Sequence, residues 1–256
     1  MMSRLRRIAA VSAAILAFSL PQFASAQEFS APQRGEIEKI VRDYLIAHPE
    51  VLQEAMAELE KRHTAAEADK QKAGVQQHAA LLFNSPRQVV LGNPKGDVTF
   101  VEFFDYNCGY CKRAMEDMMA LMKSDSNLKV VLKEFPVLGP GSVEAAQVAV
   151  AVHMQDKTGK KYLEFHQKLL SARGQVNKAA ALAAAKDVGL NVAQIEKDLA
   201  SPQVKTTLEE SYTLAQALGL NGTPSYVIGE NVVIGAVGLP ALQENINIAR
   251  CGKPTC

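Results

Sequence analysis

Three features are scarce in this sequence of 256 residues: cysteine, net charge and, after the amino terminus, long hydrophobic runs. Four cysteines are far too few for a disulfide-built scaffold, so they indicate chemistry at one site and leave room for one structural bridge. A formal net charge of +1 gives no electrostatic basis for binding nucleic acid or an acidic membrane surface. No segment beyond residue 26 is apolar enough to predict a membrane span.

The one long apolar run belongs to an expected targeting segment. Three arginines within the first seven residues precede the apolar stretch from Ile8 to Leu20, and small residues follow at 24–26. This order is typical of a secretory signal peptide, and the run is too short to cross a bilayer comfortably. We expect residues 1–26 to be removed by cleavage after Ala26, which places the mature chain in the periplasm. An uncleaved anchor is the alternative.

Residues 27–80 are predicted to form a helical extension or stalk. Apolar residues recur at helical spacing over 34–59, interrupted at His48-Pro49, and the stretch from Glu60 to about Gln77 is polar with almost no core-forming residue. An apolar stripe separated in this way from the main core either folds back onto it or pairs with another copy. Because burial is what stabilises such a helix, we expect a homo-oligomer through residues 34–59, of open stoichiometry.

The main domain is predicted at 86–250, with an α/β fold. Strands are expected at 89–91, 98–104 and 128–136, alanine-rich helices over 142–216, a hairpin over 225–234 and a last helix at 239–250. An α/β core therefore carries a helical insertion at about 142–203, and residues 251–256 form a tail.

The motif Cys108-Gly109-Tyr110-Cys111 lies between a predicted strand and a predicted helix. The first sulfur is therefore expected at a helix amino terminus, where unpaired N–H groups and the helix dipole favour a thiolate. Lys112 and Arg113 add positive charge in the first turn, and the second sulfur is close enough to close a redox-active disulfide with the first. We interpret the motif as an exposed redox site.

Two further sets of side chains are interpreted as packing residues. Methionines at 115, 118, 119 and 122 have the thioether chemistry of Cu(I) ligands, but their spacing is that of a helix face packed on a sheet. The histidines at 48, 63, 78, 153 and 166 show no metal-ligand spacing and are expected to be solvated or packed. No cofactor is expected.

Taken together, these features resemble the exported DsbA-like branch of the thioredoxin superfamily. The resemblance is carried by the run from Glu102 to Cys111, by Lys133-Glu134-Phe135-Pro136, and by Gly222-Thr223-Pro224 before the hairpin. It implies a thioredoxin-like fold with a helical insertion. It also implies a protein thiol–disulfide oxidoreductase, an enzyme that acts on cysteine-containing exported proteins and is reset by a membrane redox partner.

The resemblance also implies roles for three residues near the cysteines. Pro224 is expected in the cis form beside the motif, with the Thr223 backbone presented to an extended substrate segment. Glu102 stands where relatives carry a buried acid, which suggests proton handling for Cys111. The competing interpretation is that Glu102 faces solvent. Asp105 and Lys133 are expected to be surface charges.

Cys251 and Cys256 are expected to close a small structural disulfide in the tail, because an oxidising compartment favours it. Three alternatives stay open: a second redox pair, thiols that bridge to another chain, and a four-sulfur metal site formed with Cys108 and Cys111.

The direction of electron flow is a separate question. A Gly-Tyr spacer with Thr before the proline resembles exported disulfide isomerases more than strong oxidants, which carry Pro-His. The segment from Asp43 to Leu52 resembles the amino-terminal element of suppressor-of-copper-sensitivity C proteins, which can oligomerise through it. We therefore favour an isomerase or reductase; a dedicated dithiol oxidase, or a copper-binding protein using Cys108 and Cys111, is the alternative.

Overall fold

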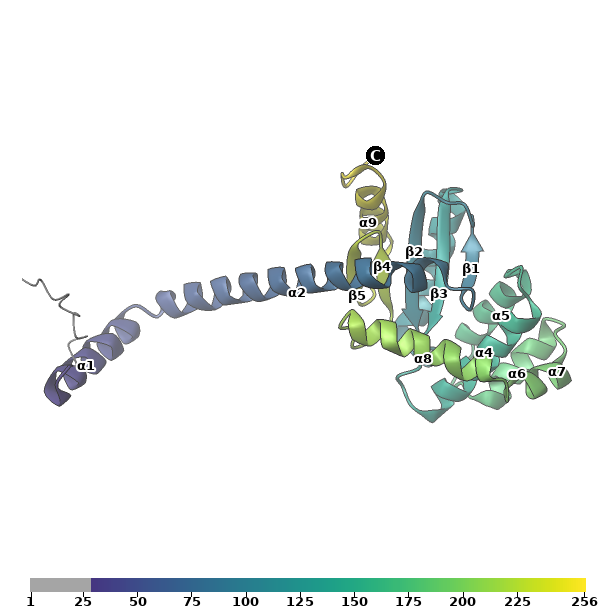
Figure 1. Cartoon of the computed structure of the whole chain (residues 1–256), viewed down its shortest axis with the longest axis horizontal. Coiled ribbons are helices and arrows are strands. Elements are labelled where there is room, and N and C mark those ends of the chain that lie inside the picture. The colour runs from purple at the N-terminus through teal and green to yellow at the C-terminus, as the bar shows by residue number, and fades with distance from the viewer. Residues whose placement is uncertain (1–28) are drawn as a thin grey trace, which may run out of the picture. The chain divides into compact units, whose positions relative to one another are not determined.

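The computed structural model describes residues 29–256, so the predicted signal peptide and its cleavage site lie outside the described residues. The chain divides into two compact units, one ending at Glu58 and the other running from Leu59 to Cys256 (Figure 1). Each unit is described by itself below.

The first unit confirms the predicted helical pair. Helix α1 (Ala31–Ala47) ends at His48, because Pro49 cannot continue its hydrogen-bond ladder, and α2 (Glu50–Asn84) begins directly after. No residue of α1 is buried. Its apolar side chains, and those of the first turns of α2, therefore lie in solvent in the single chain.

The polar stretch after residue 59 is helical, and α2 continues further than the sequence suggested. Its last turns belong to the second unit, where Val75 and Leu82 are buried against the sheet. Val75, which we predicted to lie in the extension, thus packs in the core of the second unit. A helix amino-terminal to the first strand is part of the core because its apolar residues, sparse as they are, cover one face of the sheet.

A five-stranded sheet forms the centre of the second unit, in the order β1-β3-β2-β4-β5. The strands are β1 (Val89–Gly92), β2 (Val98–Phe104), β3 (Leu128–Glu134), β4 (Ser225–Ile228) and β5 (Asn231–Ile234). Strands β2 and β3 are parallel, with Val98 opposite Leu128, and the other neighbours are antiparallel. The crossover between the parallel strands carries the helix that begins at the cysteine motif.

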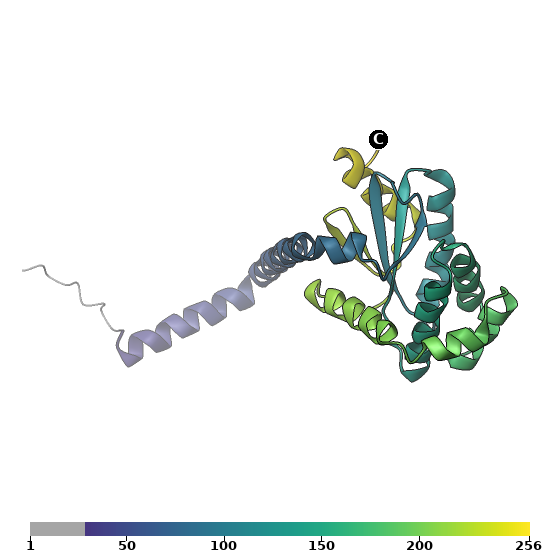
Figure 2. The same cartoon turned by 45° about the vertical axis from the view of Figure 1, so that its right-hand side comes forward.

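Seven helices of the second unit follow β2. They are α3 (Gly109–Ser124), α4 (Pro140–Gln155), α5 (Lys160–Leu170), α6 (Lys178–Asp187), α7 (Val192–Asp198), α8 (Pro202–Ala217) and α9 (Leu239–Cys251). Helices α4 to α7 gather at one end of the sheet, away from α9, in both Figure 1 and Figure 2. The predicted α/β thioredoxin-like fold with a helical insertion is confirmed.

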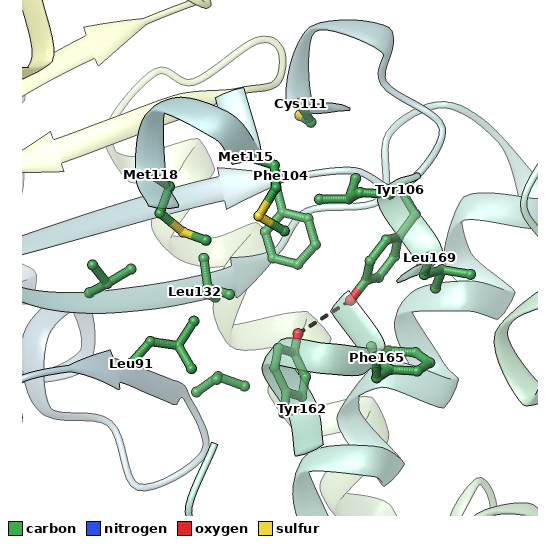
Figure 3. Close-up of a cluster of buried hydrophobic side chains, with 14 of the residues drawn as sticks. Leu91, Phe104, Tyr106, Cys111, Met115, Met118, Leu132, Tyr162, Phe165 and Leu169 are labelled. Carbon is green, nitrogen blue, oxygen red and sulfur yellow. Dashed lines mark hydrogen bonds between the residues drawn. The ribbon is translucent and has the colours of Figure 1, made fainter. Parts of the chain in front are cut away.

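Strand alternation divides the core between the two faces of the sheet. Phe100 and Val130 face a cluster with α3, α5 and α9, whereas Val101 and Val131 face a smaller one with α2 and α8. The methionine stripe lies in the first cluster, as predicted: Met115 and Met118 are buried near Phe104 (Figure 3), and Met119 and Met122 pack at its edge.

The expectation that Asp105 and Lys133 are surface charges is wrong, because both side chains are buried. Lys133 Nζ donates to Glu210 Oε1 at 3.1 Å and to the Leu81 carbonyl at 2.7 Å. The carbonyl is one of those left free at the end of α2, and the carboxylate comes from α8. Burial is tolerated because the ammonium is paired and hydrogen-bonded.

Candidate active site

The active-site turn is held by the Asp105 carboxylate at the end of β2. Asp105 accepts hydrogen bonds from the backbone N–H groups of Asn107, Val137 and Leu138 at 2.7–2.9 Å, and from Ser142 Oγ at 2.7 Å. Four donors compensate the buried charge and join the turn before the cysteines to the loop after β3 and to α4. Cys108 then caps α3 in an extended conformation, with Gly109 as the first helical residue.

Cys108 is less accessible than we expected, with 5 % of its surface exposed, and Cys111 is fully buried. The reason is the loop before β4: Cys108 Sγ donates to the Thr223 carbonyl oxygen at 3.1 Å, and the Thr223–Pro224 peptide bond is cis. Both cysteines are free thiols in the structure. The structure therefore brings Cys108, Cys111, Thr223 and Pro224 together at the start of α3.

The two sulfurs have opposite acidities. The pKa of Cys108 is lowered to about 5, chiefly because its thiolate accepts a hydrogen bond from the Cys111 thiol, with further donation from the side chain of Thr223 and from the N–H groups of Tyr110 and Cys111. The same hydrogen bond and burial raise the pKa of Cys111 well above its ordinary value. The pair therefore holds one thiolate and one thiol at neutral pH.

Lys112 and Arg113, the two cations in the first turn of α3, contact groups other than Cys108. Lys112 Nζ donates to the Ala172 carbonyl at 2.7 Å, and the Arg113 guanidinium lies 4.6 Å from the centre of the Tyr110 ring. The acidity of Cys108 consequently depends on hydrogen bonds at the helix amino terminus, and less on cationic side chains than the sequence suggested.

Glu102 is buried beneath this site, with 3 % of its surface exposed, so the interpretation that it faces solvent is wrong. Burial, with the charges of Asp117 and Cys108, raises its pKa to about 8. Its charge in turn contributes to the raised pKa of Cys111. Glu102 lies opposite Tyr226 in the β2–β4 register, and the Tyr226 hydroxyl is buried without a partner among the described residues.

The two residues between the cysteines lie at the surface, and apart from the Arg113 guanidinium over the Tyr110 ring little surrounds them. A side chain built at Gly109 would meet no atom within 4 Å, and Tyr110 is 58 % exposed. The spacer is therefore accessible to incoming molecules and contributes little to the packing of the fold.

A buried polar cluster that the sequence did not predict lies behind the site. Tyr162 Oη donates to Glu134 Oε1 at 2.7 Å, and Tyr106 Oη lies 3.1 Å from His166 Nδ1 and 3.4 Å from Tyr162 Oη (Figure 3). Burial holds the pKa of Glu134 well above its usual range and lowers that of His166 to about 3. The polar residues at 106 and 134 within strand-like apolar runs were the available signal.

Cys251 and Cys256 form a disulfide in the tail, with a Cα–Cα distance of 6.3 Å. Both residues are exposed. Among residues 29–256 no three histidine, cysteine or acidic side chains gather in a metal-binding group, so the four-sulfur site has no geometric support there.

Two family models match the chain. The DSBA-like thioredoxin domain matches residues 99–247, which is more than half of the sequence. The amino-terminal domain of the copper resistance protein ScsC matches residues 33–66, within the predicted extension.

Solved structures similar to this chain fall in the same group. A thioredoxin-like oxidoreductase from Silicibacter pomeroyi is 44 % identical, with 67 % of this chain and 96 % of that one covered and a TM-score of 0.64. Proteus mirabilis ScsC is 28 % identical over 88 % of this chain and 98 % of that one, with a TM-score of 0.63. The thiol-disulfide exchange protein α-DsbA2 from Wolbachia pipientis is 28 % identical over 71 % and 97 %, with a TM-score of 0.66.

The curated relatives are longer proteins. The Na(+)/H(+) antiporter NhaA 1 of Salinispora arenicola is 26 % identical over 65 % of this chain, but this match spans only 25 % of the antiporter. Within the described part of the chain, no helix is both long and apolar enough for a membrane crossing. The match therefore covers too little of the antiporter to indicate transport activity in this chain.

Proposed function

The chain belongs to the DsbA-like thioredoxin family of thiol–disulfide oxidoreductases, and from that premise we propose that Cys108 and Cys111 exchange disulfides with cysteine-containing exported proteins in the periplasm. The observation that carries the proposal is the opposite acidity of two adjacent thiols at the amino terminus of α3. An activated thiolate beside a protonated partner is what stepwise thiol–disulfide exchange requires.

In the reducing direction, the Cys108 thiolate attacks a substrate disulfide. A mixed disulfide forms and one substrate sulfur leaves as a thiolate, which takes up a proton. Cys111 then loses its proton and attacks Cys108 Sγ, which releases the second substrate thiolate and leaves the Cys108–Cys111 disulfide. The substrate gains two electrons and the enzyme loses two. Oxidation of a substrate dithiol is the reverse sequence. In isomerisation, another thiolate of the substrate attacks the mixed disulfide, which releases Cys108 as a thiolate and leaves a different substrate disulfide.

Glu102 is proposed to handle the proton of Cys111. A carboxyl whose pKa is about 8 exchanges a proton readily near neutral pH, and its charge already bears on the pKa of Cys111. Thr223 and Pro224 are proposed to position the substrate: the Thr223 carbonyl lies 3.1 Å from Cys108 Sγ, so an extended segment paired with this backbone would present its sulfur to the nucleophile.

We favour isomerase or reductase activity, with self-association through residues 34–59 as its basis. Large apolar side chains of the helical pair are exposed at helical spacing, among them Ile40, Tyr44, Leu52 and Met56. Their burial against a second copy would stabilise an oligomer and place several thiolates around one substrate. The match of residues 33–66 to the ScsC domain supports the proposal.

Dedicated dithiol oxidation is the alternative, in which a membrane partner reoxidises the pair. Copper binding by Cys108 and Cys111 is a second candidate, favoured by the copper-resistance description of the matched amino-terminal domain and by the affinity of thiolates for Cu(I). Titration with Cu(I) and a competing chelator distinguishes it, since stoichiometric binding that is lost in Cys108→Ala and blocks alkylation would replace the exchange proposal.

The central test is refolding of a scrambled disulfide substrate by a double variant of the apolar face, Leu52→Glu with Met56→Glu. Its matched control is Gln53→Glu with Ala57→Glu, which places the same charges at the same spacing on exposed neighbouring positions. We expect the first variant to be monomeric and to lose isomerisation while it keeps dithiol oxidation, and the control to keep both. Isomerisation that survives in a monomer would overturn the link between association and direction.

A further inference from the structure

The side chain of Asn107, the residue before the cysteine motif, is bound to the helical insertion. Asn107 Oδ1 accepts from the Val176 N–H at 2.7 Å, and Asn107 Nδ2 donates to the Val176 carbonyl at 2.9 Å. The same nitrogen donates to Ser142 Oγ at 2.9 Å. Both amide protons and the amide oxygen are therefore used, and the reverse orientation of the amide would set its oxygen against the Val176 carbonyl.

The residue after the motif is bound to the same short segment. Lys112 Nζ donates to the Ala172 carbonyl at 2.7 Å, and residues 172–176 lie in the connection between α5 and α6. Both ends of this segment are packed, since Val176 is fully buried and Ala172 contacts the main core cluster, whereas residues 173–175 are exposed. One stretch of main chain thus holds the cysteine motif from both sides.

The Val176 carbonyl is also enclosed from the side of α4. A Cβ atom built at Gly141, in the first turn of α4, would lie 2.8 Å from this oxygen, which is too close for any side chain there. Buried backbone groups that lose their partners destabilise the conformation that buries them. Loss of the Asn107 amide would therefore take a partner from both backbone groups of Val176 and release the cysteine turn from the segment.

The backbone of Cys108 must be held in place for its thiolate to form. The sulfur is stabilised by the Cys111 thiol and by the N–H groups of Tyr110 and Cys111, and such hydrogen bonds weaken steeply as their angle departs from linear. Because Asn107 directly precedes Cys108, a shift of its backbone moves the sulfur relative to these donors.

We propose that residues 172–176 position the cysteine pair for exchange, by holding Asn107 on one side of the motif and Lys112 on the other. Asn107 and Lys112 are positioning residues, because they act through the main chain of the motif. The inference rests on the proposed exchange at Cys108, and it gives the helical insertion a part in that reaction.

The rate at which iodoacetamide alkylates the reduced protein, followed against pH, tests the proposal without an exchange assay. Asn107→Ala removes the pairing with Val176 and changes no charge among the titratable groups near Cys108, which are Cys111, Glu102 and Tyr226. We expect the ratio of thiolate to thiol to fall about tenfold, as for the loss of one hydrogen bond to a charged group, which moves the midpoint up by about one pH unit. The reduction potential should fall by about 30 mV, since the reduced form loses the same stabilisation.

Asn177→Ala is the matched control. Asn177 lies in the same connection and caps α6 by accepting from the Ala180 N–H at 3.1 Å, so its loss loosens the segment without removing the pairing of Asn107. We expect its alkylation midpoint to equal that of the wild type. Equal midpoints in Asn107→Ala and the wild type, or equal shifts in both variants, would overturn the positioning role and leave the proposed exchange intact. A wild-type midpoint near the ordinary value of cysteine would overturn both.

Lys112→Met decides the question if Asn107→Ala does not fold. It removes the bond to the Ala172 carbonyl, whereas Arg113→Met removes the same charge from the same turn, from a guanidinium that lies over the Tyr110 ring. We expect the ratio of thiolate to thiol at Cys108 to fall several-fold further in Lys112→Met than in Arg113→Met. Equal falls would show that the two cations act by charge alone and would overturn the proposal.

Discussion

The two cysteine pairs of this chain occupy opposite kinds of helix end. Cys108 caps the amino terminus of α3, where N–H groups face its sulfur, whereas Cys251 is the last residue of α9, where carbonyl groups are exposed. The first pair is buried and not joined by a disulfide; the second is exposed and joined as a disulfide. The helix dipole favours a thiolate at the first position and disfavours it at the second. The surroundings, more than the cysteines themselves, distinguish the pair that we propose as the redox site from the pair that we propose as a structural bridge.

The largest expected effect separates the roles of the two pairs. Cys108→Ala is expected to reduce disulfide exchange with a model disulfide to the rate of buffer alone, because Cys111 stays protonated and buried. Cys256→Ala is the matched control and is expected to keep the full rate. Exchange that survives in the Cys108 variant would assign the nucleophile elsewhere.

The acidity of Cys108 is expected to appear directly in its alkylation. The rate of reaction of the reduced protein with iodoacetamide should be nearly constant from pH 6 to 8 and fall about tenfold per pH unit below the pKa of about 5. An unfolded chain titrates near 8.5 instead. A midpoint above pH 8 in the folded protein would remove the basis of the proposed function.

The same shift predicts a pH dependence of stability that is specific to the reduced state. Because the folded pKa of Cys108 is lowered from 9.0 to about 5, the unfolded chain binds more protons between these values, and stability rises with pH there. The free energy of unfolding of the reduced protein, relative to the oxidised one, should rise by up to about 1.4 kcal/mol per pH unit from pH 5 to 8 and be lost below pH 5. Chemical denaturation of both forms at several pH values measures this difference.

Glu102→Gln tests a second contribution to the pH dependence of stability, opposite in sign to that of Cys108. The pKa of Glu102 is raised from 4.5 to about 8 in the folded protein, so the unfolded chain loses this proton first and the free energy of unfolding falls as pH rises between these values. Glutamine does not ionise, and the variant should lack this fall. The variant should also slow resolution of the mixed disulfide near pH 7, because Cys111 loses its proposed proton acceptor. Glu116→Gln, at an exposed position of α3, is the control. Identical kinetics in Glu102→Gln and the wild type would leave Glu102 a purely structural role.

The smallest effect is expected at the tail. Cys251→Ser with Cys256→Ser should lower the free energy of unfolding by about 2 kcal/mol at most, because the closed loop is short and removes little chain entropy. The exchange rate should not change. A large loss of exchange in this variant would indicate that the second pair passes electrons to the first.

The sequence predicted the parts of the fold that depend on local patterns: both extension helices, the strands and the helix that begins at the cysteine motif. It could not predict the burial of Asp105 and Lys133, because what compensates them comes from far along the chain. Ser142 lies 37 residues from Asp105, and Glu210 lies 77 residues from Lys133. A charged residue next to a strand looks the same in sequence whether its partner is water or a distant carboxylate.

The covering of Cys108 was missed for a related reason. Its cover comes from the Thr223 carbonyl, 115 residues away, which the sequence marks only through the Thr-Pro pair. The burial of the acid at 102 was suggested by the family resemblance, since strand alternation by itself also allowed the side chain to face solvent.

The open space around the spacer has an evolutionary consequence. Gly109 is the first helical residue and nothing surrounds its Cα, a position at which proline and most side chains are accommodated without strain. Because the packing of the fold does not depend on the spacer, any mutation there that changes the reduction potential would do so at almost no cost in stability. Selection can therefore adjust an oxidant into a reductant, or the reverse, one residue at a time on an unaltered scaffold.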